Sequence, residues 1–351
     1  MFSKKALVAL SGGVDSATCA VLMKKEGYEL IGATMRLHSY SSSCLSQKDI
    51  EDAENVCKNL KIPYQVVDFS SDFEKYVIEN FISAYENGAT PNPCIECNFK
   101  LKFDKLFDYA MKNGCEYIAT GHYARIEYNE KYQRLVLKRA LDTKKDQSYV
   151  LWRLDKYKLE HTLFPLGNML SKDSVRAMAS DVGLDVSSKK ESQDICFVPD
   201  GDYAKFIEGF RKKSYPVGDF VDLSGNILGK HKGIIRYTIG QRKGLGLALP
   251  APMYVVAKDL DKNQVVLGYN DDLFSSELYA NEVNLTAIDK IEGKIRVKAK
   301  IRYNQEAKDA YASMENGLLH VVFDEPQRAI CRGQSVVLYD DDIVIGGGII
   351  C

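Results

Sequence analysis

The sequence has no long hydrophobic run and no excess of charge of either sign. No stretch approaches the roughly 18 apolar residues that a membrane helix needs, and the first apolar run, residues 6–10, ends at a serine and two glycines. We therefore expect neither a signal peptide nor a membrane association. Lys and Arg number 47 against 48 Asp and Glu, for a net charge of -1. Any surface for a polyanion must therefore be a local patch.

The nine cysteines show no paired framework. Several, such as Cys19 and Cys57, lie in apolar or helical surroundings, which is typical of reduced thiols in a reducing compartment. A C-x-x-C pair at Cys94 and Cys97 is not matched by a second such pair or by a paired-histidine motif, so a closed zinc site lacks its fourth ligand. We expect a cytoplasmic protein with free thiols.

The first half of the chain alternates between predicted strands and helices. Apolar runs over residues 6–10, 28–36, 62–69 and 116–122 predict strands, and apolar spacing predicts helices over 16–27, 47–60, 73–85 and 103–114. This alternation indicates an α/β domain with a parallel sheet covered on both faces. Ligands of such sheets bind at the carboxyl ends of the strands, where Ser11, Met35 and Gly121 fall.

The second half of the chain has a different pattern. From about Lys205 short strands separated by glycine turns predominate, and the last 81 residues, 271–351, have an all-β pattern typical of a small barrel or sandwich. We predict three domains: an α/β domain over 1–204, a small, mostly β domain over 205–270, and a C-terminal β-barrel over 271–351.

The stretch ALSGGVDSA, residues 9–17, follows the first predicted strand and opens the first helix. Glycines let backbone N–H groups approach an anion, and a helix N-terminus favours negative charge. Within it, Ser16 can hydrogen-bond a phosphate and Asp15 can hold a metal ion. The chain has no Walker A loop and no dinucleotide fingerprint, since GNILGKH at Gly225 has the wrong spacing and GLGLAL at Gly244 lacks a third glycine.

Two further stretches point to chemistry. TPNPCIECN, residues 90–98, holds Cys94 and Cys97, and its prolines predict a turn rather than a helix before the cysteines. Cys196 lies in KKESQDICFVPDG, where Lys189 and Lys190 would lower a thiol pKa. A C-x-x-C pair can belong to a metal site, an iron–sulfur site, a redox dithiol or an ordinary core. The spacing alone does not choose among them.

One predicted strand carries a row of cations. KIRVKAKIRY, residues 294–303, places Lys294, Arg296, Lys298, Lys300 and Arg302 on one face and apolar residues on the other. Such a face is either solvated or in contact with phosphates, and five cations on one strand favour phosphate contact.

These motifs carry a family resemblance. SGGVDS resembles the PP-loop of ATP pyrophosphatases, which split ATP between the α and β phosphates and adenylate a substrate oxygen. Together with TPNPxxxCN, TGHYA, KDQSYVL, SQDICF, YTIGQRKGLG and GGGII, in this order, it resembles the tRNA-specific 2-thiouridylases over essentially the whole chain. The resemblance implies ATP-dependent 2-thiolation of the wobble uridine, U34, of the tRNAs for Lys, Glu and Gln. It implies Mg²⁺ with ATP, and sulfur from a cysteine desulfurase, directly or by relay.

The resemblance also implies roles for individual residues. Cys97 matches the nucleophile and Cys196 the carrier of a persulfide, and the two would close a transient disulfide. The residues matching the ATP site are Ala9, Leu10, Ser11, Gly12, Gly13, Val14, Asp15, Ser16, Met35 and Gly121. Those matching positions that touch the target base or tRNA are Asn92, Pro93, Cys94, His122, Asp146, Gln147, Ser148, Arg302, Tyr303 and Gln334.

Cys94 departs from the family pattern, because many members have aspartate there. An unperturbed thiol has a pKa near 8.5 against about 3.9 for aspartate, so Cys94 is the weaker general base. It is either an accessory thiol or, with Cys97 and Cys196, a ligand of a 4Fe–4S cluster that would deliver sulfide. Two other classes remain open: another PP-loop ligase acting on a small acid, and a non-catalytic RNA-binding or iron–sulfur protein.

Overall fold

The computed structural model describes residues 4–37, 46–170, 195–198 and 200–351. Its N-terminal part is built on a parallel sheet with strand order β3-β2-β1-β4-β7. The strands are β1 (Lys5–Ala9), β2 (Glu29–Arg36), β3 (Tyr64–Asp68), β4 (Tyr117–Ala119) and β7 (Thr162–Leu163). Ala6 and Val8 of β1 share a buried cluster with residues of helices α1 (Val14–Lys25) and α2 (Gln47–Leu60). Leu7 packs into the other cluster, so both faces of the sheet are covered.

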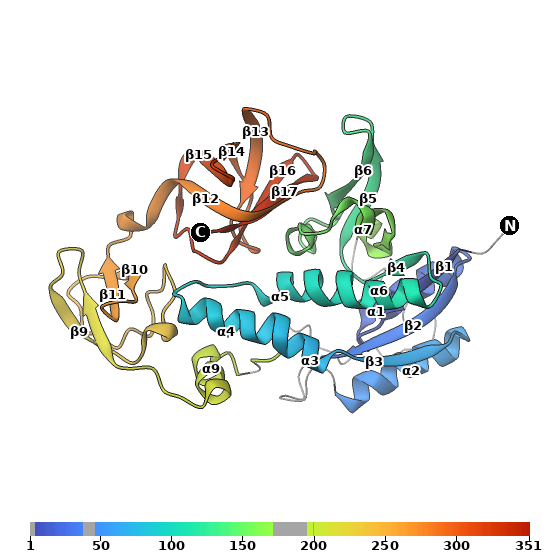
Figure 1. Cartoon of the computed structure of the whole chain (residues 1–351), viewed down its shortest axis with the longest axis horizontal. Coiled ribbons are helices and arrows are strands. Elements are labelled where there is room, and N and C mark those ends of the chain that lie inside the picture. The colour runs from blue at the N-terminus through green and yellow to red at the C-terminus, as the bar shows by residue number, and fades with distance from the viewer. Residues whose placement is uncertain (1–3, 38–45, 171–194, 199) are drawn as a thin grey trace.

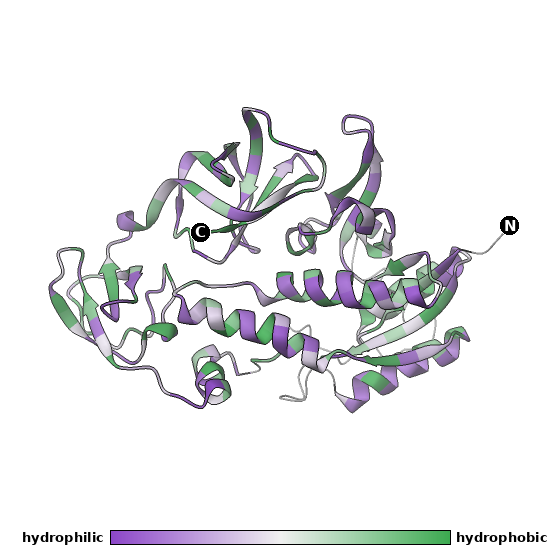
Figure 2. Cartoon of the chain, in the orientation of Figure 1, coloured by the Kyte–Doolittle hydropathy of each residue, from purple (hydrophilic) through white to green (hydrophobic). Residues whose placement is uncertain are grey.

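Two long helical segments run beside each other, from the sheet toward the central part of the chain (Figure 1). One joins α3 (Ser70–Phe73), a π-helical stretch (Glu74–Ile78) and α4 (Glu79–Glu86); the other joins α5 (Pro93–Glu96), a π-helical stretch (Cys97–Leu106) and α6 (Phe107–Lys112). Hydrophilic and hydrophobic residues alternate along both (Figure 2). The predicted turn at the cysteines is wrong, because the helix begins at Pro93. Proline fits the first helical position, where its missing N–H costs nothing.

The central part pairs helix α9 (Tyr203–Arg211) with a sheet of order β10-β11-β8-β9. Its strands are β8 (Gly218–Val221), β9 (Ile227–His231), β10 (Tyr254–Asp259) and β11 (Gln264–Gly268). The C-terminal strands are β12 (Phe274–Leu285), β13 (Lys294–Lys300), β14 (Lys308–Glu315), β15 (Leu318–Arg328), β16 (Ser335–Asp340) and β17 (Ile343–Ile350). β12 pairs with both β15 and β17, which closes these strands into a barrel. The predicted fold class is confirmed.

A hairpin from the N-terminal part joins the C-terminal sheet. β5 (Ala124–Asn129) and β6 (Arg134–Arg139) pair with each other, and Lys138 of β6 pairs with Ile343 of β17. Nearby, the single Trp152 is fully buried and its Nε1–H donates to Ser335 Oγ of β16 at 3.0 Å. A Cβ on Gly347 of β17 would lie 3.0 Å from the indole ring, so this glycine lets the strand approach Trp152. The α/β part and the barrel therefore share one buried interface.

The shorter elements connect these parts. They are α7 (Lys156–Glu160) and short 3₁₀ turns at Ser148–Leu151, Pro165–Asn168, Ile234–Arg236 and Asp271–Leu273. Within the described ranges, no helix has the length and apolar character needed to span a bilayer.

Candidate active site

The phosphate loop lies between β1 and α1, at the carboxyl edge of the sheet. Gly12 has φ +71°, and a Cβ there would lie 2.4 Å from the carbonyl oxygen of Asp49 in α2, so only glycine fits. Gly13 caps α1 without any side-chain hydrogen bond. The Ser16 hydroxyl donates to Gly13 O at 2.9 Å and accepts from the Ser11 N–H at 3.2 Å, so it also shapes the loop. The loop presents the N-terminus of α1 to an anion.

The strands on either side of β1 complete this edge. Met35 lies near the end of β2, and Gly121 comes after Thr120, the residue that follows β4. A Cβ on Gly121 would lie 2.8 Å from the backbone carbon of Asp15, so the chain after β4 packs against the start of α1. The carboxylate of Asp15 accepts a hydrogen bond from the Tyr123 hydroxyl at 2.8 Å. The structure thus brings together the residues that the sequence assigned to ATP.

Cys94 and Cys97 lie on the second helical segment. The Asn92 side chain caps α5 by accepting from the Cys94 N–H at 3.1 Å, and Cys97 begins the π-helical stretch. Cys94 is exposed on one side, whereas Cys97 and Cys196 are half-buried. Desolvation raises the pKa of both Cys94 and Cys97, the latter to about 12, and charge on Cys196 raises both further. This mutual influence places the three thiols near one another.

A cation near these thiols is Lys102, which the sequence reading missed. Its positive charge lowers the pKa of Cys94 and Cys97 against the effect of desolvation. Lys189 and Lys190, which the sequence suggested for this role, lie outside the described residues. The sequence pattern did not predict that Lys102 faces Cys97, because the two residues share a helix face only if the helix is a π-helix. In a π-helix the hydrogen bonds close five residues apart. Lys102 therefore falls one turn after Cys97, whereas α-helical spacing would turn it away.

A 4Fe–4S cluster on this chain would need Cys94, Cys97 and Cys196 as a grouped set of ligands. Among the described residues, which include Cys94, Cys97 and Cys196, no three His, Cys, Asp or Glu side chains are grouped so that they could hold a metal ion. The arrangement of thiols in the structure therefore does not fit a 4Fe–4S cluster.

His122 is buried rather than displayed to solvent. Burial, and then the charge of Lys102, lower its pKa well below the usual range, so the ring is neutral. Its Nδ1 lies 2.7 Å from Thr120 Oγ1 and its Nε2 lies 3.5 Å from Lys102 Nζ. Because lysine can only donate, Nε2 is the acceptor and Nδ1 carries the hydrogen. Phe103 and Phe164 pack around the ring.

A largely buried turn beside the site is formed by Asp146, Gln147 and Ser148, and its side chains make hydrogen bonds within the protein. Asp146 accepts from the N–H and hydroxyl of Ser148 at 3.1 and 2.9 Å, and both residues are buried. The Gln147 side chain accepts from the Tyr123 N–H at 3.0 Å, which links this turn to the partner of Asp15. Two of the three residues predicted to touch tRNA thus have structural hydrogen bonds and little exposed surface.

The barrel contributes three further predicted residues. Tyr303 is 38% exposed, and its pKa is raised by desolvation and by charge on Asp146 and Cys94, which places its hydroxyl near the site. Gln334 Nε2 donates to Thr90 O at 2.6 Å, so the barrel holds the segment that leads to Cys94. Arg302 donates to Ala329 O and, at 3.2 Å, to Cys331 Sγ.

The row of cations on β13 is present but largely paired. Arg296 makes a bidentate contact with Asp324 at 2.7 and 2.6 Å, and Lys298 lies 3.4 Å from Asp309. Asp309 belongs to β14, which pairs with β13, and Asp324 belongs to β15, the next strand beyond β14. A single-strand pattern cannot reveal either acid. Lys300 differs, because its ammonium lies 5.6 Å from the rings of both Tyr149 and Tyr303. Of these three cations, Lys300 is the one that borders the site.

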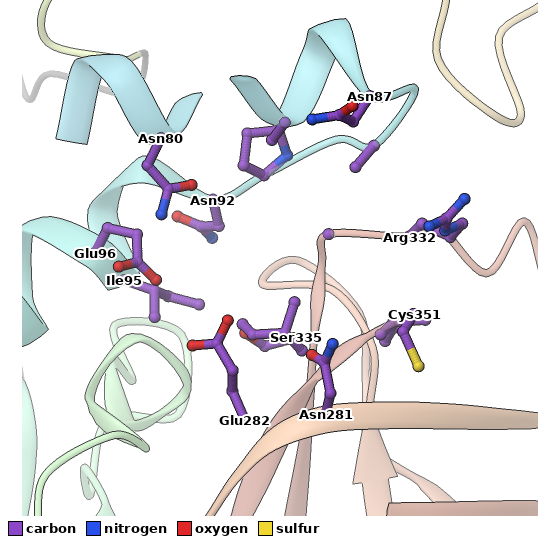
Figure 3. A pocket seen from close by; sticks show the side chains of 16 residues that line it. Asn80, Asn87, Asn92, Ile95, Glu96, Asn281, Glu282, Arg332, Ser335 and Cys351 are labelled. Carbon is purple, nitrogen blue, oxygen red and sulfur yellow. The ribbon is translucent and has the colours of Figure 1, made fainter. Parts of the chain in front are cut away.

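A pocket of about 380 Å³ lies behind the cysteine segment, between the helical segments and the barrel. Figure 3 shows Asn80, Asn92 and Glu96 facing Asn281 and Glu282 across it. Arg153 bridges the two sides by pairing with Glu96 and, at 2.7 Å, with Glu282. This contact fixes the helical segment that carries Cys94 and Cys97 against the barrel.

The fold and this site define a class: an α/β domain with a PP-loop, followed by two β domains. Family models match in that order, as a tRNA methyl transferase HUP domain over residues 4–200, a tRNA methyl transferase PRC-barrel domain over 204–269, and an aminomethyltransferase β-barrel domain over 275–350. A tRNA-specific 2-thiouridylase of Acetivibrio thermocellus is 50% identical over 100% of both chains, and one of Clostridioides difficile is 48% identical over 99% of this chain and 98% of its own. The chain belongs to the tRNA-specific 2-thiouridylase family.

Proposed function

We propose that the chain is an ATP-dependent sulfurtransferase that converts U34 of the tRNAs for Lys, Glu and Gln to 2-thiouridine. One observation supports this most: the phosphate loop and the cysteines are joined at one edge of the sheet. Gly121 packs on the loop, and the next residue, His122, contacts Lys102 on the cysteine helix. An adenylated base could therefore be formed and attacked without leaving the site.

The first step uses the loop. ATP enters with Mg²⁺, the α1 N-terminus and loop N–H groups face its phosphates, and Asp15 is the carboxylate able to hold the ion. The uracil O2 attacks the α phosphate, forming an O–P bond, and pyrophosphate leaves with the electron pair. The base carbon C2 then carries AMP as a leaving group.

The second step uses the thiols. The terminal sulfur of a persulfide on Cys196 attacks C2, the C–S bond forms, and AMP leaves with the oxygen. The thiolate of Cys97 then attacks the Cys196 sulfur, a Cys97–Cys196 disulfide forms, and the electron pair passes to the sulfur on C2. A cysteine desulfurase or a relay protein supplies the persulfide, and a cellular thiol reduces the disulfide, as the cytoplasm provides.

The tRNA would be held at the junction of the helical segment and the barrel. Asn92, Pro93 and Cys94 lie at the start of the cysteine helix, and Tyr303 of the barrel is near them. We assign base and tRNA contact to these residues and to Arg302. His122, Asp146, Gln147, Ser148 and Gln334 act mainly by positioning this surface.

The test measures pyrophosphate release with and without unmodified tRNA, and 2-thiouridine by mass spectrometry after addition of a cysteine desulfurase and cysteine. Release should require tRNA and fall to background in Asp15→Ala. Lys24→Ala, at the far end of α1, is the matched control and should behave as the unaltered chain. Release that depends on a small acid instead of tRNA would favour another PP-loop ligase. Near-normal release from Asp15→Ala would overturn the assignment of the loop.

A further inference from the structure

Lys102 carries a positive charge beside the cysteines. Its helix neighbour Lys105 pairs with Asp72 at 3.2 Å, whereas no carboxylate in the described part of the chain pairs with Lys102. Its contact is the neutral ring of His122, at 3.5 Å. A half-buried ammonium held by a neutral acceptor keeps its full charge available to another group.

The π-helical stretch decides where this charge points. It spans Cys97–Leu106 and places Lys102 one turn after Cys97. His122, which lies shortly after the end of β4, contacts the ammonium from the other side, and its own ring lies 2.7 Å from Thr120 Oγ1. The helix and the sheet edge thus fix the ammonium between the phosphate loop and the cysteines.

Resting thiols here are poor nucleophiles. Desolvation raises the pKa of Cys97, which begins the π-helical stretch. An anionic sulfur therefore needs a fixed positive charge nearby, because preorganised charge stabilises a transition state without the cost of reorganisation.

We propose that Lys102 is a catalytic residue of sulfur release, whose ammonium stabilises the anionic sulfur of Cys97 as it attacks Cys196. The inference rests on the proposed function. Lys102 forms no covalent bond and gives up no proton in this step. Before the step, the transferred sulfur joins C2 of the base to Cys196 through an S–S bond. Attack by Cys97 breaks that bond, and the electron pair leaves on the sulfur of the product.

Removal of the charge should arrest the reaction at this point. In Lys102→Met, tRNA-dependent pyrophosphate release should stay within about twofold, while 2-thiouridine formation falls ~100-fold, the scale of one lost electrostatic contact. A tRNA–protein adduct should accumulate on denaturing gels without reductant and disappear with dithiothreitol. Lys100→Met, the same change on the same helix without contact to His122, should release pyrophosphate, form 2-thiouridine and leave no adduct, as the unaltered chain does.

Two further variants separate charge from structure. Lys102→Arg should retain activity to within about tenfold, and in Lys102→Ala ethylammonium, but not sodium at equal concentration, should restore release of the adduct. Thiolation by Lys102→Met at the rate of Lys100→Met would overturn the proposal, and so would loss of thiolation with no adduct. If the unaltered chain shows no tRNA-dependent pyrophosphate release, the proposed function itself fails and the role of Lys102 falls with it.

Discussion

Replacement of Gly12 by alanine should damage the phosphate loop far more than the same change at Gly27. Both residues have positive φ, +71° and +85°, so both variants carry the left-handed strain of about 1–2 kcal/mol. At Gly12 the new Cβ would also meet the Asp49 backbone, with atoms at 2.4, 2.7 and 2.9 Å, whereas at Gly27 nothing lies within 4 Å. The Asp49 atoms are helix backbone and cannot rotate away.

The difference between the two variants therefore isolates the overpacking cost. Forcing a methyl group into a packed contact costs about 1–3 kcal/mol, which is added to the strain. Gly12→Ala should thus lose about 2–5 kcal/mol of unfolding free energy, the sum of the backbone strain and the overpacking. Gly27→Ala should lose only the backbone strain, about 1–2 kcal/mol. To relieve the clash, the loop must move away from α2, which displaces the N–H groups that face the phosphates. ATP affinity should therefore fall at least about tenfold in Gly12→Ala, which corresponds to a loss of about 1.4 kcal/mol of binding free energy.

The assay is urea unfolding followed by fluorescence of the single Trp152 and by circular dichroism, with ATP binding measured by calorimetry. Gly27→Ala should bind ATP like the unaltered chain. Equal destabilisation in both variants, or full ATP affinity in Gly12→Ala, would refute the reasoning that Asp49 fixes the loop.

Three other predictions concern the thiols, the cations and a surface histidine. Cys97→Ser should lose 2-thiouridine formation but keep tRNA-dependent pyrophosphate release, whereas Cys351→Ser, at the exposed C-terminus, should keep both. Lys300→Met should lower the slope of log affinity for tRNA against log salt by about one, and the already paired Lys298→Met should leave it unchanged, as filter binding would show. Desolvation lowers the pKa of His320, but the hydrogen bonds that its ring donates to Glu315 and Glu277 outweigh this effect and raise the pKa. His320→Asn should therefore lose up to about 1 kcal/mol of stability at pH 5.5, and less as pH rises past the folded pKa, in thermal unfolding scans; a loss that grows with pH would contradict this.

The sequence determined the elements and their order because local signals carried them. The apolar run at residues 6–10, followed by small residues and a helical pattern, could only be a buried strand leading into a helix. The alternation of strand and helix then required a parallel sheet, and a parallel sheet places the loop, Met35 and Gly121 at one edge. The position of the phosphate loop beside Met35 and Gly121 followed from the pattern for this reason.

Only the tertiary structure decided the electrostatics around the thiols and cations. Arg296 and Lys298 find their acids on strands that are distant in sequence, and the hairpin β5–β6 crosses into the C-terminal sheet. Lys102 faces the site because its helix is a π-helix there, and the spacing of apolar residues in the sequence does not predict a π-helix. The sequence by itself determined which residue types the chain holds for adenylation and sulfur transfer. Which charges remain unpaired beside them depends on contacts between residues far apart in the chain, and therefore on the folded structure alone.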